Sequence, residues 1–291
     1  MKKIEDINIL VVGDIMLDHY ILGDVERISP EAPVPVVNVY DDDFSLGGCG
    51  NVVRNLTELG VQASCITDFG HDEAGQFIAD ELVRLKCRYT NLLSSKITTQ
   101  KIRIIGGETQ TQMIRIDRED TSPAEYKLDI ENSYDIIIVA DYGKGVVTRG
   151  LMDKLRAMNT PIIVDPKPEN IEIYGDVFMI TPNQKEWDAM RWKDGLTYIF
   201  EHALVTKGKD GMRLLGVGKE PIIIPTIPVK VFNVSGAGDT VTAIMAVCIA
   251  LGFDPEKSAH IANECAGYVV TQPGTSVVPK GLFLEIMNKY N

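Results

Sequence analysis

Short apolar runs alternate with longer amphipathic stretches along this chain, and this pattern predicts an α/β fold. Residues 7–12 (INILVV) form a nearly uninterrupted apolar run, which is typical of a strand buried on both faces of a parallel sheet. Runs of similar character occupy residues 63–67, 135–140, 162–164, 177–180 and 203–205. Because helical segments separate most of these runs, the order favours a mainly parallel sheet with helices packed on its faces.

Three segments have the features of helices that would cover such a sheet. A helix opened by the glycine-rich residues 47–51 runs to Leu59, and Gly60 suits the left-handed position that follows many helices. Residues 73–85 are amphipathic. The stretch after Asp239 is apolar over many residues, as expected for a buried helix.

The middle of the chain departs from this alternation. Residues 101–105 and 112–117 alternate charged and apolar side chains, which predicts two strands of a sheet with one face in water. Gly106-Gly107 lies between them and predicts a hairpin. These two strands therefore belong to a structure that projects from the main sheet.

A proline-rich segment predicts a further strand of the same projection. Three prolines within residues 30–35 mark the strand-like residues 34–39 as an edge strand or a flap, because proline cannot donate to a central ladder. Asp41-Asp42-Asp43 is most simply a solvated turn. Together with the hairpin, this segment predicts a small β lid built from about residues 19–42 and 97–118.

Composition and charge narrow the class of protein. The 291 residues are 45% hydrophobic, which suffices for one sizeable α/β domain over residues 1–291, or for two small ones. A formal net charge of −12 argues against a nucleic-acid surface or an anionic membrane surface. The five cysteines form no CxxC pair, and the four histidines lack the spacing of a zinc site. The N-terminal apolar run is too short for a signal peptide or a membrane span, so we expect a soluble cytoplasmic protein with reduced thiols.

Polar side chains follow the predicted strands at the point where each one ends. Six residues occupy such positions: Asp14, Asp68, Asp141, Asp165, Asn183 and Thr206. The carboxyl ends of parallel strands meet at one edge of a sheet, where open α/β sheets bind ligands. One such residue would carry little weight, but six together predict a binding site at this edge.

The turn at residues 235–240 (SGAGDT) carries the most specific chemistry. Gly236 and Gly238 let the backbone turn tightly and let a ligand approach closely. The helix that follows leaves its first amide groups unpaired and directs the positive end of its dipole at the turn, which suits phosphate or a developing negative charge. Asp239, beside an anion hole formed by these glycines and Ala237, can take a proton from an attacking hydroxyl group. The alternative is an ordinary strand-to-helix turn.

Two further motifs each admit a structural and a functional interpretation. Gly47-Gly48 with Asn51 could be a flexible turn that starts a helix, or bare amides and a side chain that hold sugar hydroxyls. Asn183 and Glu186 have the spacing of a capping box. They could equally lie near nucleotide phosphates, with Glu186 ordering hydrated Mg²⁺.

Cations on the predicted lid could neutralise an anionic ligand. Lys101, Arg103 and Arg115 would offset a sugar phosphate in so acidic a protein if they face one pocket, although they could instead be solvated. Lys144, in the loop after the 135–140 strand, is a further candidate for a phosphate contact. The chain lacks GxxxxGK[ST], and no GxGxxG follows its first strand, so P-loop and dinucleotide-binding folds have no support.

Taken together, these segments resemble the ribokinase-like (PfkB) family of sugar kinases over nearly the whole chain. The resemblance rests on the Gly-Gly…Asn region at residues 47–51 and on Asn-x-Ser-Gly-Ala-Gly-Asp-Thr at residues 233–240. A narrower resemblance is to the bacterial D-glycero-β-D-manno-heptose-7-phosphate kinases, which act in ADP-heptose synthesis for lipopolysaccharide. It rests on residues 12–18, 28–36 and 112–117.

The resemblance implies a ribokinase-like three-layer core with a mainly parallel central sheet and a small β-sheet lid that often supports a homodimer. It also implies that Mg-ATP donates its γ-phosphoryl group to the anomeric O1 of heptose 7-phosphate, with Asp239 as the base. The need for a monovalent cation is left open. The implied sugar-side residues are Asp14, Asp18, Gly47, Gly48, Asn51, Lys101, Arg103, Arg115, Lys144 and Asp239. The implied nucleotide-side residues are Asn183, Glu186 (to Mg²⁺ through water), Thr206, Lys207, Gly208, Gly211, Gly236 and Gly238.

Two other functions stay open. Another sugar or sugar-phosphate kinase of the same family, ribokinase-like or fructokinase-like, would share everything but the lid residues. A non-catalytic member that binds sugar as a sensor is the alternative from a different class. The intact Gly-Ala-Gly turn and Asp239 argue against the sensor.

Overall fold

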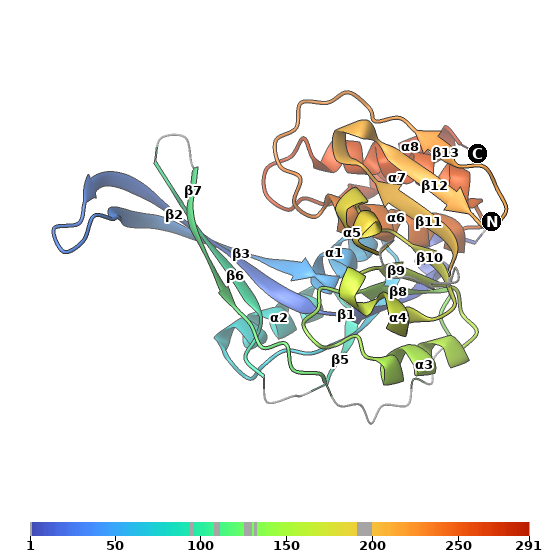
Figure 1. Ribbon diagram of the computed structural model, residues 1–291, viewed down its shortest axis with the longest axis horizontal. Coiled ribbons are helices and arrows are strands. Elements are labelled where there is room, and N and C mark those ends of the chain that lie inside the picture. The colour runs from blue at the N-terminus through green and yellow to red at the C-terminus, as the bar shows by residue number, and fades with distance from the viewer. Residues whose placement is uncertain are drawn as a thin grey trace.

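The computed structural model describes residues 2–92, 96–107, 111–124, 130, 133–190 and 200–290. In this part of the chain a large sheet with helices on both faces carries a smaller sheet, which projects far to one side (Figure 1). The predicted α/β fold, with a mainly parallel central sheet and a separate small sheet, is confirmed.

The large sheet has nine described strands in the order β13-β12-β11-β10-β9-β8-β1-β4-β5. Their bounds are β1 Asn8–Gly13, β4 Gln62–Thr67, β5 Arg88–Asn91, β8 Ile136–Ala140, β9 Ile162–Asp165, β10 Val177–Ile180, β11 Phe200–Thr206, β12 Met212–Gly216 and β13 Ile222–Ile224. The strands from β5 to β11 pair in parallel, whereas β12 and β13 add antiparallel at one edge. The carboxyl ends of the parallel strands therefore meet at one edge of the sheet, as predicted.

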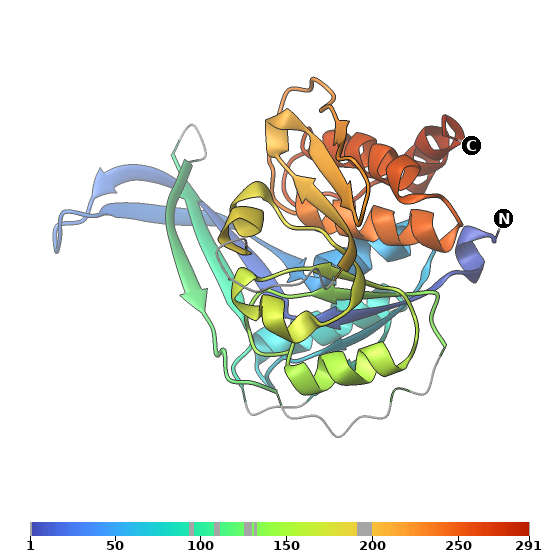
Figure 2. The same ribbon diagram turned by 45° about the vertical axis from the view of Figure 1, so that its right-hand side comes forward.

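Helices cover both faces of this sheet and complete three layers (Figures 1 and 2). One face carries α1 (Cys49–Leu59), α2 (Glu73–Arg84), α6 (Ala237–Ala250), α7 (Pro255–Val269) and α8 (Lys280–Asn288). The other face carries α3 (Arg149–Ala157), α4 (Ile171–Tyr174) and α5 (Gln184–Met190). Short 3₁₀ turns are η1 (Ile4–Asp6), η2 (Pro168–Asn170) and η3 (Gly208–Asp210).

The central strand β1 explains why its sequence is nearly continuous in apolar residues. Ile9 and Val11 pack into the core beneath α1 and α6, while Leu10 and Val12 pack into the core on the opposite face. Because successive side chains of a strand point to opposite faces, both parities must be apolar when both faces are covered. The same burial explains the uniform apolar run of α6, whose residues from Asp239 to Cys248 are all buried.

The smaller sheet, which we call the lid, has the strand order β3-β2-β6-β7. Its strands are β2 (Ile15–Ile28), β3 (Pro35–Gly48), β6 (Gln100–Gly106) and β7 (Thr111–Arg118). β2 pairs antiparallel with β3 and parallel with β6, and β6 pairs antiparallel with β7. The tip of the predicted β6–β7 hairpin, residues 108–110, lies outside the described residues. Proline opens the edge strand β3, in agreement with the positional preference of this residue.

The predicted solvated turn at Asp41-Asp42-Asp43 is wrong. These residues lie inside β3, where they pair with residues 20–22 of β2. All three are exposed, because the lid strands project from the body and meet water there. A charge run in such a strand needs no burial of carboxylates, so the composition of the run does not require a turn.

Two predictions about the environment of the chain can be compared with the structure. All five cysteines are unpaired and buried, as predicted for reduced thiols. Among the described helices, none combines the length and the apolar character needed to cross a membrane.

Candidate active site

The turn before α6 is shaped by Gly236, which caps the helix with a left-handed φ of 78°. A Cβ atom at this position would lie 2.6 Å from the Asn51 side-chain nitrogen and 2.7 Å from Thr275 Cγ2. The Thr240 amide donates to the Gly236 carbonyl at 3.0 Å. The amides of Gly238 and Asp239 belong to the first helical turn, for which a helix supplies no carbonyl partner. The turn thus has the geometry of an anion-binding helix terminus.

Two glycine substitutions in this turn should differ in their effect on stability. Gly236→Ala should lower the free energy of unfolding by about 1–3 kcal/mol, because it places a side chain at a left-handed φ and against Asn51. Gly238→Ala is the matched control, since its Cβ would meet nothing within 4 Å. It should be neutral or stabilise by up to about 1 kcal/mol. Urea denaturation of both variants measures the difference, and equal stabilities would contradict this account of Gly236.

Asp239 is buried in the first turn of α6 and accepts hydrogen bonds on both carboxylate oxygens. Asn51 of α1 donates its side-chain N–H to Oδ2 at 2.8 Å, and the Tyr142 hydroxyl donates to Oδ1. Burial raises the pKa of Asp239 from 3.8 to about 6, although both hydrogen bonds act to lower it. A carboxylate with this pKa is ionised at neutral pH and still able to accept a proton, as a general base requires.

Asp14 holds the loop that carries Tyr142. Its carboxylate accepts the backbone N–H groups of Tyr142 (2.8 Å), Lys144 (3.0 Å) and Val146 (3.0 Å). Asp14 is almost completely buried, so these bonds replace the water that its charge would otherwise need. The predicted sugar-binding role of Asp14 stays a prediction, and the contacts present fix the loop after β8.

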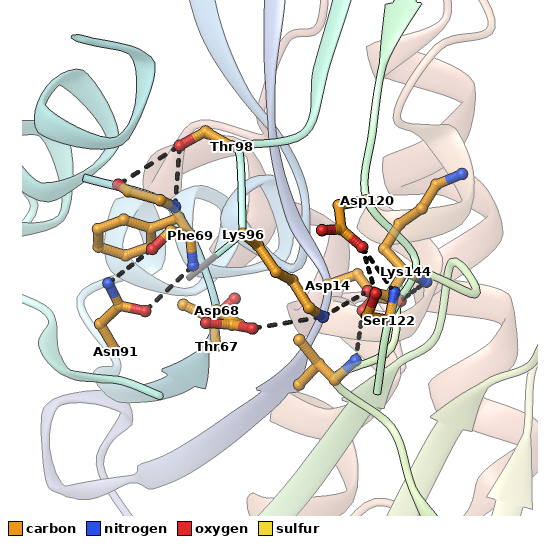
Figure 3. Close-up of polar contacts among 12 residues, drawn as sticks. Asp14, Thr67, Asp68, Phe69, Asn91, Lys96, Thr98, Asp120, Ser122 and Lys144 are labelled. Carbon is orange, nitrogen blue, oxygen red and sulfur yellow. Dashed lines mark hydrogen bonds and ion pairs between the residues drawn. The ribbon is translucent and has the colours of Figure 1, made fainter. Parts of the chain in front are cut away.

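A buried lysine holds the same loop from a second side (Figure 3). Lys96 lies between Asp68, which follows β4, and Lys144. Its Nζ lies 3.4 Å from a carboxylate oxygen of Asp68 and donates to the Lys144 carbonyl at 3.2 Å. Neither Lys96 nor Tyr142 was predicted from the sequence to belong to the site. Tyr142 directly follows Asp141, one of the predicted strand-end residues, and this position is the signal that could have found it.

The lid brings further predicted sugar-side residues to this loop. Arg103 of β6 donates to Asp18 of β2 at 2.6 Å, and a Cβ atom on Gly47 would lie 2.4 Å from the same carboxylate group. The Lys101 ammonium lies 5.7 Å from the centroid of the Tyr142 ring, within reach of a cation–π interaction. Lys101 is thus placed beside the loop that contacts Asp239, and Asp18 is close enough for its charge to act on both Lys101 and Asp239.

The cations predicted to bind phosphate lie close enough to affect one another, but most of them have carboxylate partners. Burial lowers the pKa of Lys101, and the charges of Arg103, Lys144 and Arg115 lower it further, whereas Asp18 raises it. Arg115 pairs with Asp117 at 2.9 Å and is half exposed, and Lys144 pairs with Glu119. Lys101 has no ion-pair partner among the residues that the structure describes. It is therefore the cation best placed to meet an added anion.

The predicted nucleotide-side residues form two local turns. Asn183 and Glu186 exchange backbone-to-side-chain hydrogen bonds of 2.8 and 3.0 Å, so the capping box is present. Asn183 also pairs with Thr206 in an isolated parallel bridge. The Lys207 amide donates to the Gly211 carbonyl at 2.8 Å, which closes a tight turn over Gly208. These contacts join the two segments, and the nucleotide role of the residues stays a prediction.

Asp165, at the end of β9, is a carboxyl group close enough to Asp239 and Glu186 for their charges to act on it. Burial raises the pKa of Asp165 well above its usual value, and the charges of Asp239, Glu186 and Asp141 raise it further. Carboxylates that repel one another in this way fit a bound cation that would offset their charge. Among the described residues, no group of three or more His, Cys, Asp or Glu side chains could hold a metal ion by itself. Asp165 was predicted as a strand-end residue but was given no specific role.

Comparisons with known proteins agree with this arrangement. The family model described as pfkB family carbohydrate kinase matches residues 6–280. The chain is 38% identical over 298 residues to the bifunctional protein HldE of Caulobacter vibrioides and 39% identical over 299 residues to that of Desulfatibacillum aliphaticivorans. Each match covers 93% of this chain and 61% of the relative, so the chain spans less than two thirds of their length.

Solved structures share the fold. A ribokinase from Thermotoga maritima superposes with a TM-score of 0.74 at 18% identity, covering 97% of this chain and 99% of that one. A ribokinase of Arabidopsis thaliana in complex with ribose and ATP gives a TM-score of 0.71 at 19% identity, covering 96% of this chain and 98% of that one. At these identities the likeness is one of fold alone.

Proposed function

The chain belongs to the pfkB family of carbohydrate kinases, and from this membership we propose that it phosphorylates D-glycero-β-D-manno-heptose 7-phosphate on its anomeric O1. The donor is ATP, and the products are the 1,7-bisphosphate and ADP. The observation that carries the proposal is the position of Asp239. It lies buried at the start of α6, beside the Gly-Ala-Gly turn, and accepts a hydrogen bond from Tyr142. The ring of Tyr142 in turn lies near Lys101 of the lid.

In this reaction Asp239 accepts the proton of the attacking O1 hydroxyl. O1 then bonds to the γ-phosphorus, the bond from that phosphorus to the β–γ bridging oxygen breaks, and ADP leaves. Charge that develops on the transferred group is stabilised by the amides of Gly238 and Asp239 and by the positive end of the α6 dipole. Phosphoryl transfer depends mostly on such positioning and charge stabilisation, so few protein groups need to take part chemically.

We propose Mg-ATP as the donor, held on the side of the site where β9, β10 and β11 end. Mg²⁺ is usually bound by one or two carboxylates together with substrate phosphates and water. Glu186 would order the hydrated ion. The repulsion between the carboxyl group of Asp165 and those of Asp239 and Glu186 supports a cation on this side. Thr206, Lys207 and the turn to Gly211 would line the nucleotide.

The choice of a sugar phosphate rests on the lid cations and on the sequence resemblance to heptose-7-phosphate kinases. Lys101, Arg103 and Arg115 lie on two paired strands, with Arg103 directly opposite Arg115. Directly paired residues of a sheet share one face. These cations would offset the phosphate at the far end of the sugar, with Lys144 as a further contact.

We further propose that two copies associate through the lid and act in the cytoplasm. The lid face opposite the cations carries Ile114 and Ile116, which are 53% and 41% exposed. Apolar side chains exposed in a contiguous patch are typical of an interface. The buried, unpaired cysteines suit a reducing compartment.

The proposed activity can be tested with a panel of sugar phosphates and the matching unphosphorylated sugars, assayed for ADP release at a fixed concentration of Mg-ATP. Heptose 7-phosphate should give the highest kcat/KM, and phosphorus NMR should show a new phosphate on the anomeric carbon. Preference for another sugar would replace the heptose assignment by a different kinase of the family. Binding of sugars without any ADP release would favour the sensor.

A further inference from the structure

We propose that Tyr142 is a positioning residue for the base, and that its hydroxyl holds the Asp239 carboxylate in the orientation that receives the acceptor's proton. The inference rests on the proposed kinase function and extends it to a residue that the sugar and nucleotide assignments leave out. Its basis is the hydrogen bond from the Tyr142 hydroxyl to Asp239 Oδ1.

Asp239 is held by one donor on each oxygen, and the two donors come from different elements. Asn51 on α1 donates to Oδ2, and Tyr142 on the loop after β8 donates to Oδ1. Arg54 lies one turn further along α1, 3.4 Å from Asn51 Oδ1, and so fixes which end of the amide faces the carboxylate. A carboxylate has about four lone-pair positions, so two remain for the acceptor hydroxyl. Loss of the Tyr142 bond would leave Asp239 held on one side only.

The loop gives Tyr142 little freedom to move away. Its backbone amide is bonded to buried Asp14, and Lys96 holds the carbonyl of Lys144 two residues further on. The Lys101 ammonium lies against its ring. A tyrosine tethered at both its backbone and its ring loses little further entropy when its hydroxyl bonds to the base.

The direction of the hydrogen bond follows from the charges around it. Burial, followed by the charge of Asp239, raises the pKa of Tyr142 well above its usual value, so Tyr142 stays protonated and donates. The ionisable groups that face Asp239 are Asp18 on β2, Lys101 on β6, Asp165 at the end of β9 and Tyr142 itself. Asp18 acts to raise the pKa of Asp239, whereas Lys101 and the Tyr142 bond act to lower it. Tyr142 therefore favours the ionised base.

The experiment is the pH profile of kcat/KM for Tyr142→Phe, with any sugar that the wild type accepts. The substitution removes one oxygen atom and keeps the ring. We expect the acid limb to move to higher pH by about one unit, the scale of one hydrogen bond to a charged group. At a pH above the acid limbs of both the wild type and the variant, kcat of Tyr142→Phe should still be lower than that of the wild type, while KM for Mg-ATP stays unchanged. Tyr290→Phe is the matched control, because its hydroxyl donates to Glu264 at 2.7 Å and away from the site, and it should alter neither quantity.

A second readout needs no turnover. Carbon NMR of the aspartate carboxyl groups, with Asp239→Asn identifying the signal, should show Asp239 titrating at higher pH in Tyr142→Phe than in the wild type. An unchanged titration together with an unchanged acid limb would overturn the proposal. If Tyr142→Phe does not fold, Asp14→Asn takes its place, because it weakens the anchor of the same loop. The titration of Asp239 should again move to higher pH, and an unchanged titration in Asp14→Asn would also overturn the proposal. Failure of the proposed kinase function would look different from failure of the Tyr142 role. In the first case the wild type would phosphorylate no sugar, while the titration of Asp239 would still report on Tyr142.

Discussion

Asp239→Asn should reduce turnover by about 10²-fold or more, the scale expected when a general base is lost, while the protein stays folded and binds ATP. The amide that replaces the carboxylate cannot accept the acceptor's proton. The anion hole depends on the backbone amides of Gly238 and Asp239, which the substitution of a side chain leaves in place. We therefore expect the loss in kcat and not in the affinity for nucleotide.

The stability of this variant follows from the raised pKa of Asp239. A carboxyl group whose pKa is about 6 in the folded protein and 3.8 in the unfolded chain binds protons more tightly when folded. Stability therefore falls as the pH rises from about 4 to 6, and the ionised group costs on the order of 3 kcal/mol above that window. Asparagine carries no charge, so Asp239→Asn should be at least as stable as the wild type at neutral pH.

Three measurements check the role of Asp239. Steady-state kinetics gives the loss in kcat, calorimetry with a non-hydrolysable ATP analogue gives nucleotide affinity, and urea denaturation gives stability. In the wild type, kcat/KM should fall below about pH 6, where Asp239 becomes protonated. Asp153→Asn, an exposed position on α3, controls for the loss of a carboxylate and should behave as the wild type. Near-normal turnover of Asp239→Asn would remove Asp239 from the base role.

Much of the fold could be predicted from the sequence because local patterns and tertiary burial agree. The run at residues 7–12 is apolar in both parities because β1 lies between two cores. Gly60 ends α1 with a φ of 88°, a conformation that glycine adopts without strain. Helix α6 is apolar from Ala243 onward because helices and the sheet surround it. In each case one residue type satisfies both the local and the global requirement.

The parts that could not be predicted depend on contacts between distant segments. Strands β12 and β13 are five and three residues long at an antiparallel edge, too short for a clear periodicity. The loop after β8 carries no local signal that Lys96 and Asp14 would hold it, 48 and 130 residues away from Lys144. Its tyrosine therefore reaches Asp239 through tertiary structure alone.

Among the lid cations, the structure separates one that is free to bind from others that are already paired. Arg103 donates to Asp18, so its removal would leave a buried carboxylate without a partner and would disturb the lid itself. Lys101 has no ion-pair partner within the described residues and lies nearer the loop over Asp239. Lys101 and Arg103 cannot be distinguished from the sequence, but their different partners in the structure make Lys101 the sharper test.

Lys101→Met should raise KM for heptose 7-phosphate by roughly 10- to 150-fold, which corresponds to the loss of about 1.5–3 kcal/mol for a hydrogen bond to a charged group. Methionine keeps much of the length and apolar character of the lysine stem, so the packing against Tyr142 should largely persist. The affinity for ATP should hardly change, because Lys101 lies on the lid and not at the strands that end near Asn183 and Thr206.

The unphosphorylated heptose makes this test specific for the phosphate. If Lys101 binds the 7-phosphate, activity on the unphosphorylated sugar, however weak, should be nearly the same in Lys101→Met and in the wild type when both are assayed well above the Asp239 pKa of about 6. Lys289→Met is the control for the loss of one positive charge from the whole protein. Lys289 is exposed, directly follows α8 and pairs with Glu264. Steady-state kinetics on both sugars measures all three proteins. Equal losses on the two sugars would mean that Lys101 supports the lid or the base, because a group that binds only the phosphate cannot affect a sugar that lacks one.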